Sequence, residues 1–464
     1  GHALACCDLL DYSLMVATTN QLQQGEFSGW GHTATNRNTY SRPLSTGELQ
    51  ESLDRHSGRS LIAYGLGRSY GDTALNARGD VVWTDQLNRT ESFDADSGEL
   101  VCESGVTIRQ ILDERVSAGF VPSISPGTGF VTVGGALAND IHGKNHDKDG
   151  SFADHVNWFE LVLADGNVVQ VDRDSNPDLF AATVGGIGLT GLITRVSLNL
   201  KPARGDSVLV TEIRCTDLDD FIAKLVEHRE TAQYSVGWVD AVATGKSMGR
   251  GILQIGRLAD ESLNRNTSGS LAVPFWLPTG LLNRYTVRAF NELYFRRVPS
   301  KGRESLMPYA KFMYPLDALH DWYKIYGKRG FYQFQCVLPD DEAIAGLQSL
   351  FTTISKSGCS SFLAVIKTMG ASGQGLLSFP MRGFTLALDI PRRPGIEAVI
   401  NDLERMTVER GGRVYLAKDT TLSPEYFREM YSDAGRFEDI LREHDPTGRF
   451  QSDMSRRIGL RADD

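Results

Sequence analysis

Glycine and basic side chains are concentrated in one stretch, residues 126–155, which reads PGTGFVTVGGALANDIHGKNHDKDGSFADH. Glycine lets a backbone approach a ligand closely, and a run of turns aligns N–H groups toward an anion such as a pyrophosphate. His142, Lys144 and His146 stand in the same run. A long structural loop is the alternative, but clustered histidine and lysine among glycines are unusual in a plain connection. We therefore predict an anion-binding loop with acid–base groups beside it.

A second glycine-rich loop lies upstream. The apolar run 60–64 predicts a strand, and Gly65-Leu66-Gly67-Arg68-Ser69-Tyr70-Gly71-Asp72 follows it at once. A strand that runs into a glycine-rich loop is a phosphate-cradling arrangement. The spacing is GxGxxxG, so the loop does not match the dinucleotide fingerprint of a Rossmann unit.

Residues 186–191, GIGLTG, match that fingerprint in spacing alone. They follow a helical piece and lead into an alternating strand at 192–200, whereas the fingerprint requires a strand before and a helix after. We therefore predict no nicotinamide site here. The backbone of this loop remains available to approach a cofactor.

The elements that must position these loops are short. Residues 1–40 have no clear pattern, and 132–138 fits either a helix start or a buried strand. Asp165-Gly166 between two apolar runs predicts a hairpin. The predicted helices are 45–57, 106–118 and 178–182, and the predicted strands are 81–83, 100–103, 159–163 and 167–171.

Residues 201–206 carry Pro202 and Gly205 and predict a domain boundary. From about 207 to 414, strands alternate with amphipathic helices, which favours an α+β domain over an antiparallel sheet. The predicted strands are 207–213, 234–239, 332–337 and 385–390, and the predicted helices are 218–230, 341–356 and 395–411.

The pattern breaks down between about 259 and 308, where aromatic residues stand among Arg284, Arg288, Arg296 and Arg297. A long, weakly patterned segment is often a mobile lid or a binding loop. Aromatics among arginines would suit an amphiphile with a phosphate head. A loop packed on its own domain is an equally open alternative. Beyond this segment, 414–417 predicts a strand that ends in Lys418-Asp419, and 424–430 predicts a helix.

Composition restricts the function. The 464 residues carry a formal net charge of −10, which argues against nucleic-acid binding as the main task. No apolar run reaches the length of a membrane span. The six cysteines are scattered without a CxxC pair, which favours a reduced, cytoplasmic-type setting and no metal site. Gly1-His2 is interpreted as an expression scar, and 9–15 is too short and too acidic at its start for a signal peptide.

The glycine loops together resemble those of the vanillyl-alcohol-oxidase-type (PCMH-type) FAD flavoproteins. The resemblance is carried by 63–72, Pro126-Gly127-Thr128, 132–136 and 140–146, and extends through 150–152, 182–186, Trp238, 314–317, 378–380, 417–419 and 452–454. It covers about residues 29–460. It is closest to the branch of this family that oxidises polyprenylphosphoryl ribose in arabinan biosynthesis, a part of cell wall biogenesis.

The resemblance implies an α+β, two-domain flavoprotein. Its FAD domain would come from both chain ends, 20–205 and 415–464, with a substrate domain at 206–414 that includes the segment 259–308. It also implies oxidation of the 2′-hydroxyl of polyprenylphosphoryl (decaprenylphosphoryl) β-D-ribose to a ketone. A separate short-chain dehydrogenase/reductase partner would complete the epimerisation to the arabinose lipid.

Many relatives tether their flavin to a histidine of the first glycine loop. Because that loop offers Arg68, Ser69 and Tyr70 here, we expect non-covalent FAD. The residues implied to bind the cofactor lie mostly in the motifs above. They are Gly65, Gly67, Arg68, Ser69, Tyr70, Gly71, Pro126, Gly127, Thr128, Thr132, Gly134, Gly135, Asn139, His142, Gly143, Asn145, His146, Ile193, Tyr415, Ala417 and Lys418.

Flavin-dependent oxidation of an alcohol needs a group that accepts the hydroxyl proton. Lys418 is the first candidate, because a desolvated lysine beside other cations loses its proton more easily. His142 and Tyr70 are the further catalytic candidates. Without the family, Lys418 would be interpreted as a surface lysine and His142 as a structural histidine.

The residues implied to bind substrate are Lys144, Trp238, Tyr314, Gln333, Gln335, Lys367, Thr385 and Ala387. Trp238, Tyr314, Gln333 and Gln335 would form walls of the pocket. Without the resemblance, each would equally be interpreted as part of the core or of a sheet surface. The related branch has Asn in place of Thr385, and in place of Ala387 it has a reactive Cys that nitroaromatic inhibitors modify. Ala387 has no nucleophile, so we expect no such adduct, and the altered wall leaves the substrate open.

Three hypotheses therefore stand: an oxidase of a polyprenyl-phosphate pentose, a flavin oxidase or dehydrogenase of a soluble sugar, alditol, aldonolactone or nucleoside, and a non-catalytic binding protein. Bound flavin that a substrate can reduce would exclude the third. We expect a cytoplasmic protein or one at most peripheral to a membrane. A periplasmic location stays open.

Overall fold

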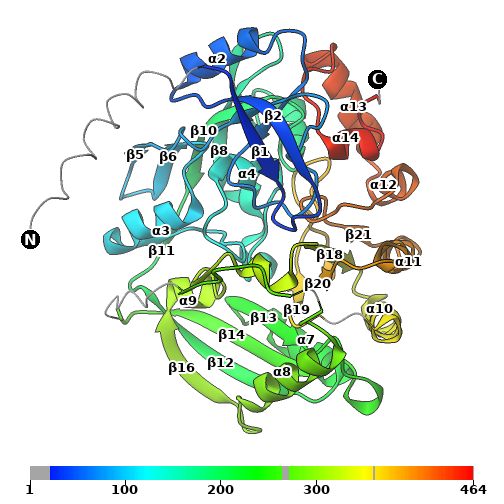
Figure 1. The fold of residues 1–464 in the computed structure, drawn as a ribbon. Coiled ribbons are helices and arrows are strands. Elements are labelled where there is room, and N and C mark those ends of the chain that lie inside the picture. The colour runs from blue at the N-terminus through cyan, green and yellow to red at the C-terminus, as the bar shows by residue number, and fades with distance from the viewer. Residues whose placement is uncertain (1–20, 264–270, 279, 359–360, 463–464) are drawn as a thin grey trace, which may run out of the picture.

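The computed structural model describes residues 21–462 except 264–270, 279 and 359–360. Figure 1 shows two regions, an upper one that contains both ends of the described chain and a lower one built from its middle. The upper region holds a four-stranded sheet and a five-stranded sheet. The lower region holds an eight-stranded sheet.

The four-stranded sheet has the order β1 (Gln23–Ser28), β2 (Thr35–Ser41), β4 (Asp80–Trp83), β3 (Leu61–Tyr64). The five-stranded sheet is antiparallel, with the order β5 (Thr90–Phe93), β6 (Glu99–Glu103), β10 (Leu192–Asn199), β8 (Val156–Val162), β9 (Val168–Asp172). The remaining elements of this part are the two-stranded pair β7 (Phe120–Val121) and β11 (Lys201–Pro202) and the helices α2 (Thr46–Arg55), α3 (Ile108–Arg115), α4 (Val133–Ala138), α5 (His146–Asp149) and α6 (Pro177–Thr183).

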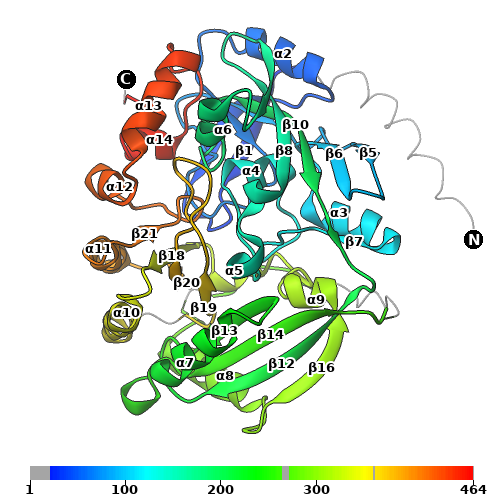
Figure 2. The same cartoon turned by 180° about the vertical axis from the view of Figure 1, so that it is seen from behind.

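The C-terminal segment returns to the upper region. The Leu61 N–H donates to the Arg449 carbonyl at 2.7 Å, and the Gln451 N–H donates to the Leu61 carbonyl at 2.9 Å, so the tail pairs with β3. Figure 2 shows the helices of this tail beside the early elements. They are α12 (Pro424–Met430), α13 (Ala434–His444) and α14 (Asp453–Arg457).

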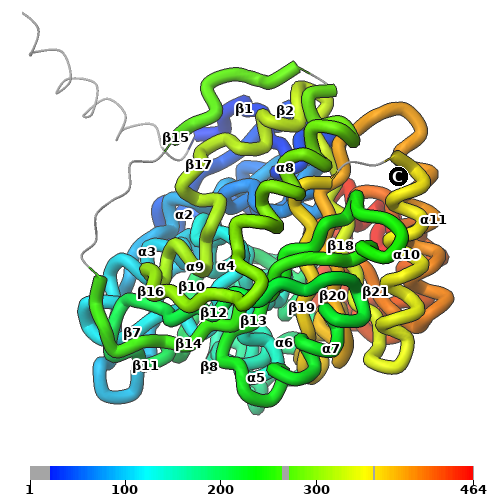
Figure 3. Tube along the Cα trace, turned by 90° about the horizontal axis from the view of Figure 1, so that it is seen from below, coloured from blue at the N-terminus to red at the C-terminus, as the bar shows by residue number. Residues whose placement is uncertain are grey.

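The eight-stranded sheet is antiparallel. Its order is β16 (Arg303–Pro308), β12 (Ser207–Cys215), β14 (Gly251–Ala259), β13 (Tyr234–Val239), β19 (Ala364–Met369), β20 (Gly383–Pro391), β18 (Phe331–Leu338), β21 (Arg413–Val414). Figure 3 shows α10 (Ala343–Ser357) and α11 (Ile396–Val408) beside β18 and β21. The other elements are α7 (Leu218–Arg229), α8 (Arg284–Arg296), α9 (Tyr309–Met313) and the parallel pair β15 (Leu271–Ala272) and β17 (Leu319–His320).

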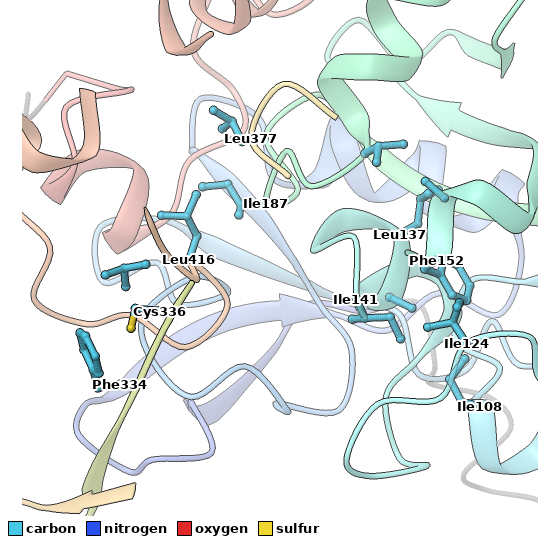
Figure 4. Close-up of a cluster of buried hydrophobic side chains, with 14 of the residues drawn as sticks. Ile108, Ile124, Leu137, Ile141, Phe152, Ile187, Phe334, Cys336, Leu377 and Leu416 are labelled. Atoms are coloured by element: carbon cyan, nitrogen blue, oxygen red, sulfur yellow. The ribbon is translucent and has the colours of Figure 1, made fainter. Parts of the chain in front are cut away.

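One face of this sheet is covered by helices. A Cβ added to Gly237 or Gly251 would lie 2.1 Å and 2.5 Å from the ring of Phe221 on α7, so both strands need glycine for α7 to approach. Phe334 and Cys336 of β18 lie in one buried cluster with Leu137 of α4 (Figure 4). The core is therefore continuous between the two regions, and the other sheet face is left for the site.

The α+β fold class is confirmed, and most expected elements are present. Residues 132–138 form a helix, α4, whose N-cap Thr132 accepts from the Gly135 N–H at 3.2 Å. The hairpin at Asp165-Gly166 joins β8 to β9. Residues 186–191 lie between α6 and β10, which is the reverse of the fingerprint order.

Several expectations were wrong. Residues 1–40 were expected to be irregular, but β1 and β2 pair there, because a polar strand pattern carries little periodicity. The segment 259–308 contains α8, capped by Asn283, and the edge strand β16. The strand expected at 414–417 ends at Val414, and the chain then turns, with the Lys418 N–H donating to the Tyr415 carbonyl at 3.0 Å. The tail helices α13 and α14 were missed.

Cys102, Cys215 and Cys336 are free and buried. The interpretations of Gly1-His2 and of 9–15 concern residues outside the described part of the chain.

Candidate active site

A cavity of about 1160 Å³ lies between the glycine loops of the upper region and the uncovered face of the eight-stranded sheet. Both regions contribute to its lining. Every residue expected to bind cofactor or substrate lines it except Asn145, His146 and Tyr314. The fold therefore brings together residues as far apart in the chain as Gly65 and Lys418.

The three exceptions lie behind the cavity wall. The Asn145 amide donates to the Ser123 carbonyl at 2.8 Å, which fixes the loop. His146 Nδ1 accepts from the Gly370 N–H at 2.9 Å. The Tyr314 hydroxyl lies 2.9 Å from Ser125 Oγ in the core. These groups support the loop around residues 140–146 and do not reach the cavity.

The loop after β3 presents its backbone to the cavity. Gly67 has φ +61°, and a Cβ there would lie 2.1 Å from the Tyr64 hydroxyl, so glycine is required. The Trp30 N–H donates to the Ser69 carbonyl at 2.8 Å, and the Tyr70 N–H donates to the Ala417 carbonyl at 3.0 Å. Within the described residues, the N–H groups of residues 66–69 have no acceptor in the protein.

Buried polar side-chain atoms at the same end also lack partners among the described residues. They are Arg68 Nε, Ser104 Oγ and Asn139 Oδ1, and all three residues line the cavity. Arg68 stacks over Trp30 with its guanidinium carbon 4.1 Å from the ring centre. Unpaired buried donors and acceptors are costly, so this end fits a polar ligand such as the pyrophosphate and ribityl part of FAD.

The opposite wall is made of side chains from the sheet. In an antiparallel sheet, directly paired residues place their side chains on the same face. Lys367 pairs with Thr385, and Gln335 pairs with Ala387. Trp238 pairs with Val365 on the neighbouring strands. The register therefore brings these side chains from β13, β19, β20 and β18 to one surface.

Lys418 stands where the two walls meet. Its ammonium donates to Gln333 Oε1 and lies 4.4 Å from the ring centre of Tyr70. Burial lowers the pKa of Lys418 to about 8, although the carboxylate of Asp389 acts in the opposite direction. Burial also raises the pKa of Tyr70 well above its usual range, so its hydroxyl stays protonated.

Asp389 was not predicted. Its side chain accepts from the Gln333 amide nitrogen and from the Tyr326 hydroxyl, the latter at 3.0 Å. Burial raises its pKa to about 6. Because the carboxylate accepts from the Gln333 nitrogen, the amide oxygen must face Lys418. The alternation that puts Thr385 and Ala387 on one face also puts Asp389 there, and this was the available signal.

His142 lies beside a second lysine, Lys367. Its Nδ1 is 3.1 Å from Lys367 Nζ, and its Nε2 is 3.1 Å from the Gln335 amide nitrogen. Burial and then the charge of Lys367 lower the pKa of His142 well below its usual value. The neutral ring has one N–H and one acceptor nitrogen, so His142 accepts a hydrogen bond at only one of these two positions.

Lys144 donates to the Phe312 carbonyl and lies 4.3 Å from the Phe312 ring centre. Burial lowers the pKa of Lys144 to about 7, and Lys367 adds to the effect. Burial and then Lys418 lower the pKa of Lys367 to about 7. The three lysines thus share one part of the cavity, where an anion would restore their charged forms.

A second charged group lines the part of the cavity next to α8 and was also missed. Glu212 of β12 accepts from Arg297 at 2.7 Å and from the Gln254 amide at 2.9 Å, and it pairs with Arg303. Arg297 and Arg303 both lie in the segment 259–308, but only Arg297 was named there from the sequence. The pairing of β12 with β14 and β16, which brings Gln254 and Arg303 to Glu212, leaves no local motif.

At one end of the site, backbone N–H groups of the loop after β3 face the cavity without an acceptor among the described residues. At the other end, three buried lysines lie together, and the amine of Lys418 is held by the amide of Gln333. Such an arrangement can bind a phosphorylated cofactor at one end and take a proton from a substrate hydroxyl at the other.

In sequence comparisons, the family described as FAD binding domain matches residues 39–172, and that described as D-arabinono-1,4-lactone oxidase matches residues 387–458.

Individual relatives agree with these families. The decaprenylphosphoryl-beta-D-ribose oxidase of Mycolicibacterium smegmatis is 36% identical over 93% of this chain and 97% of its own. A Streptomyces coelicolor protein, named "Uncharacterized protein in mprA 5'region", is 33% identical over 76% of this chain and all of its own. The L-gulonolactone oxidase of Mus musculus is 27% identical over 45% of this chain and 47% of its own. This chain therefore belongs to the FAD-binding oxidoreductases of the vanillyl-alcohol-oxidase type, in the same family as the Mycolicibacterium oxidase.

Proposed function

We propose that this protein oxidises the 2′-hydroxyl of a polyprenylphosphoryl (decaprenylphosphoryl) β-D-ribose to the 2′-keto sugar, the first half of an epimerisation to the arabinose lipid. The observation that carries the proposal is the position of Lys418, a lysine of lowered pKa held by Gln333 between the cofactor loops and two further lysines. The name of the Mycolicibacterium relative supports the choice of substrate.

In this proposal Lys418 Nζ accepts the proton of the substrate hydroxyl. The amine has to be neutral to do so, and its pKa of about 8 makes the neutral form accessible. The hydrogen bond from Lys418 Nζ to Gln333 uses one N–H of the neutral amine, so the lone pair of the nitrogen can face the substrate in the cavity. Bound FAD supplies the acceptor for the hydride from the carbon that carries the hydroxyl. Tyr70, which stays protonated, covers Lys418 and limits the access of water.

The substrate phosphate is assigned to Lys144 and Lys367. Both ammonium groups face the cavity with pKa values of about 7, and a bound phosphate would favour their charged forms. His142 orients Lys367 through its Nδ1. Gln335, Thr385, Ala387 and Trp238 are assigned to the walls around the sugar, with Ala387 offering no thiol.

We further propose that FAD is held without a covalent bond. The loop at 65–71 offers no histidine, and its free N–H groups and Arg68 supply a non-covalent cradle. Residues 20–205 and 415–464 would form the FAD domain, and 206–414 the substrate domain. A short-chain reductase is the partner proposed to consume the ketone, and the protein would work in the cytoplasm or at the periphery of a membrane.

A soluble sugar, alditol, nucleoside or aldonolactone is the second candidate substrate class. The match of residues 387–458 to the family described as D-arabinono-1,4-lactone oxidase favours an aldonolactone within that class. That stretch includes Ala387 and Lys418, so it covers part of the proposed site.

A substrate panel separates the two candidates. The purified protein is mixed under anaerobic conditions with a short-chain polyprenylphosphoryl β-D-ribose, with ribitol, with a ribonucleoside or with D-arabinono-1,4-lactone. We expect loss of the oxidised-flavin absorbance with the first compound and a product lighter by two hydrogens. Loss of absorbance with the lactone or a soluble alcohol alone would overturn the proposed substrate.

A further inference from the structure

Exposed apolar side chains gather on one stretch of the central region. Six of the ten exposed large hydrophobic residues in the described part of the chain lie between 271 and 293. They are Leu271, Phe275, Leu281, Tyr285, Phe290 and Leu293. Such a gathering marks an interaction site more often than chance exposure does.

Helix α8 carries the clearest part of it. Tyr285, Ala289 and Leu293 are spaced four residues apart and so lie on one helix face. Tyr285 and Leu293 are 76% and 73% exposed. Val287 and Asn291 lie on the opposite face and are buried, and the Asn291 amide donates to Asp240 at 2.7 Å. The helix is therefore anchored on one side and apolar toward solvent on the other.

Basic side chains flank this apolar row. Arg284 and Arg288 are exposed on α8, and within the described residues neither has a carboxylate at ion-pair distance. The chain as a whole has a net charge of −10, so a cationic face of this kind is a local departure from the charge of the molecule. An apolar row with arginines beside it has the chemistry of a helix that lies in the interface of an anionic bilayer.

The same helix borders the cavity. Phe290, Tyr294 and Arg297 line it from the anchored side of α8. The ring of Tyr294 lies 4.7 Å from that of Trp238 on the sheet. Figure 3 shows α8 on the side of the molecule that also carries the β15–β17 pair. Among the described helices, none has the length and apolar character needed to cross a bilayer.

We propose that α8 docks this protein on an anionic lipid surface, with Tyr285, Ala289 and Leu293 in the acyl boundary and Arg284 and Arg288 on the headgroups. This proposal rests on the proposed function. Docking through α8 would place the part of the cavity that α8 lines at the membrane, where a lipid-linked substrate is found. A second copy of the chain fits less well, since a two-fold contact would oppose the same arginines.

The test is co-sedimentation of the full chain with vesicles of phosphatidylcholine, with and without phosphatidylglycerol. We expect binding to the vesicles that contain phosphatidylglycerol. The double variant Arg284→Ala/Arg288→Ala should bind about 25-fold more weakly, at roughly fivefold per arginine. The double variant Tyr285→Ser/Leu293→Ser should lose binding to the vesicles that contain phosphatidylglycerol.

Val226→Ser/Ile344→Ser is the matched control, because both residues are exposed, at 53% and 47%, on other helices. This variant should bind as the unmodified chain does. Unchanged vesicle binding in both α8 variants, or no binding by the unmodified chain, would overturn the proposal. A concentration-dependent mass increase in solution that the α8 variants abolish would also overturn it, in favour of a second copy as occupant.

Flavin reduction by a soluble short-chain substrate separates this proposal from the proposed function. None of the four substituted α8 residues is assigned to the site, so reduction should proceed at the same rate in the α8 variants. Vesicle binding without reduction by the lipid phosphate would overturn the proposed function alone. Reduction without vesicle binding would overturn the docking surface alone.

Discussion

The two ends of the cavity use different chemistry. At the cofactor end, the loop at 65–71 presents backbone N–H groups, and its shape depends on Gly67 in a left-handed conformation. At the sheet end, Lys144, Lys367 and Lys418 present buried amines whose pKa values fall to between about 7 and about 8. The first end has a fixed pattern of donors, whereas the charge of the second changes with pH.

This difference assigns each end its task. Backbone donors keep their polarity at any pH and suit a cofactor that stays bound through many turnovers. Amines that titrate near neutral pH suit a substrate that arrives as an anion and gives up a proton. Substitutions at the cofactor end should therefore weaken FAD binding, whereas substitutions at the sheet end should impair substrate binding and flavin reduction.

The largest effect is expected at Lys418. Lys418→Met should keep bound FAD and lose roughly 10²–10⁴-fold in the rate of flavin reduction, because no group then accepts the hydroxyl proton. Stopped-flow reduction under anaerobic conditions measures the rate, and the flavin absorbance of the purified variant reports cofactor content.

Lys418→Arg is the control for charge. Arginine can still donate to Gln333, but it does not lose its proton in the accessible pH range. It should therefore be as slow as Lys418→Met. A normal rate in Lys418→Arg would show that position 418 supplies charge and accepts no proton.

At the cofactor end, Gly67→Ala should weaken FAD binding by at least about tenfold while the protein stays folded. Alanine at φ +61° is strained by about 1 kcal/mol, and its Cβ would meet the Tyr64 hydroxyl. Titration of the apoprotein with FAD measures the affinity.

Gly58→Ala is the control that distinguishes the backbone strain of alanine at positive φ from a change in the shape of the cofactor loop. Gly58 has φ +75° with no atom within 4 Å of an added Cβ, and it lies outside the cavity lining. It should lose similar stability and keep its FAD affinity. Equal FAD affinities in the two variants would show that the loop shape does not set cofactor binding.

The lysines assigned to phosphate should act on affinity. Lys367→Met or Lys144→Met is expected to raise the Kd of the phosphorylated substrate about tenfold, as for the loss of one buried charge-assisted hydrogen bond. In the unmodified protein, the Kd should rise as pH increases through about 7, because both amines become neutral. Equilibrium titration with a 2′-deoxy substrate analogue measures this, and a Kd independent of pH between 6 and 8 would contradict the assignment.

The rate of flavin reduction should move with pH in the opposite sense. It should rise through about pH 8, because only the neutral amine of Lys418 accepts a proton. The Asp389 carboxylate favours the charged amine, so Asp389→Asn should shift this midpoint to lower pH, by about one unit or less. Asparagine keeps an oxygen for the Gln333 amide, which preserves the geometry. If the midpoint does not move, the Asp389 carboxylate does not influence the pKa of Lys418.

The same contrast explains what the sequence could predict. The cofactor end is built from contiguous glycine runs, so 65–71 and 126–143 are recognisable as loops from the order of their residues alone. The groups around Lys418 come from separate strands. Asp389 and Tyr326 meet Gln333 only through the register of β18 with β20 and the packing beside it.

Resemblance located Lys418, Lys367 and His142, but a single sequence does not give their mutual distances. The Glu212 cluster and the apolar row of α8 were missed for two physical reasons. Strand pairing that joins residues about 90 positions apart, such as Glu212 with Arg303, leaves no local motif. Which apolar residues of α8 stay exposed depends on the burial of Val287 and Asn291 on its other side, and residue spacing alone does not give that packing.

The most direct test of the central assignment is anaerobic reduction of the bound flavin by a short-chain polyprenylphosphoryl β-D-ribose, compared with its 2′-deoxy analogue across pH. We predict reduction by the first compound, with a rate that rises through about pH 8, and tight binding without reduction for the second. Reduction by the 2′-deoxy analogue, or no reduction by the ribose compound while D-arabinono-1,4-lactone reduces the flavin, would contradict the account.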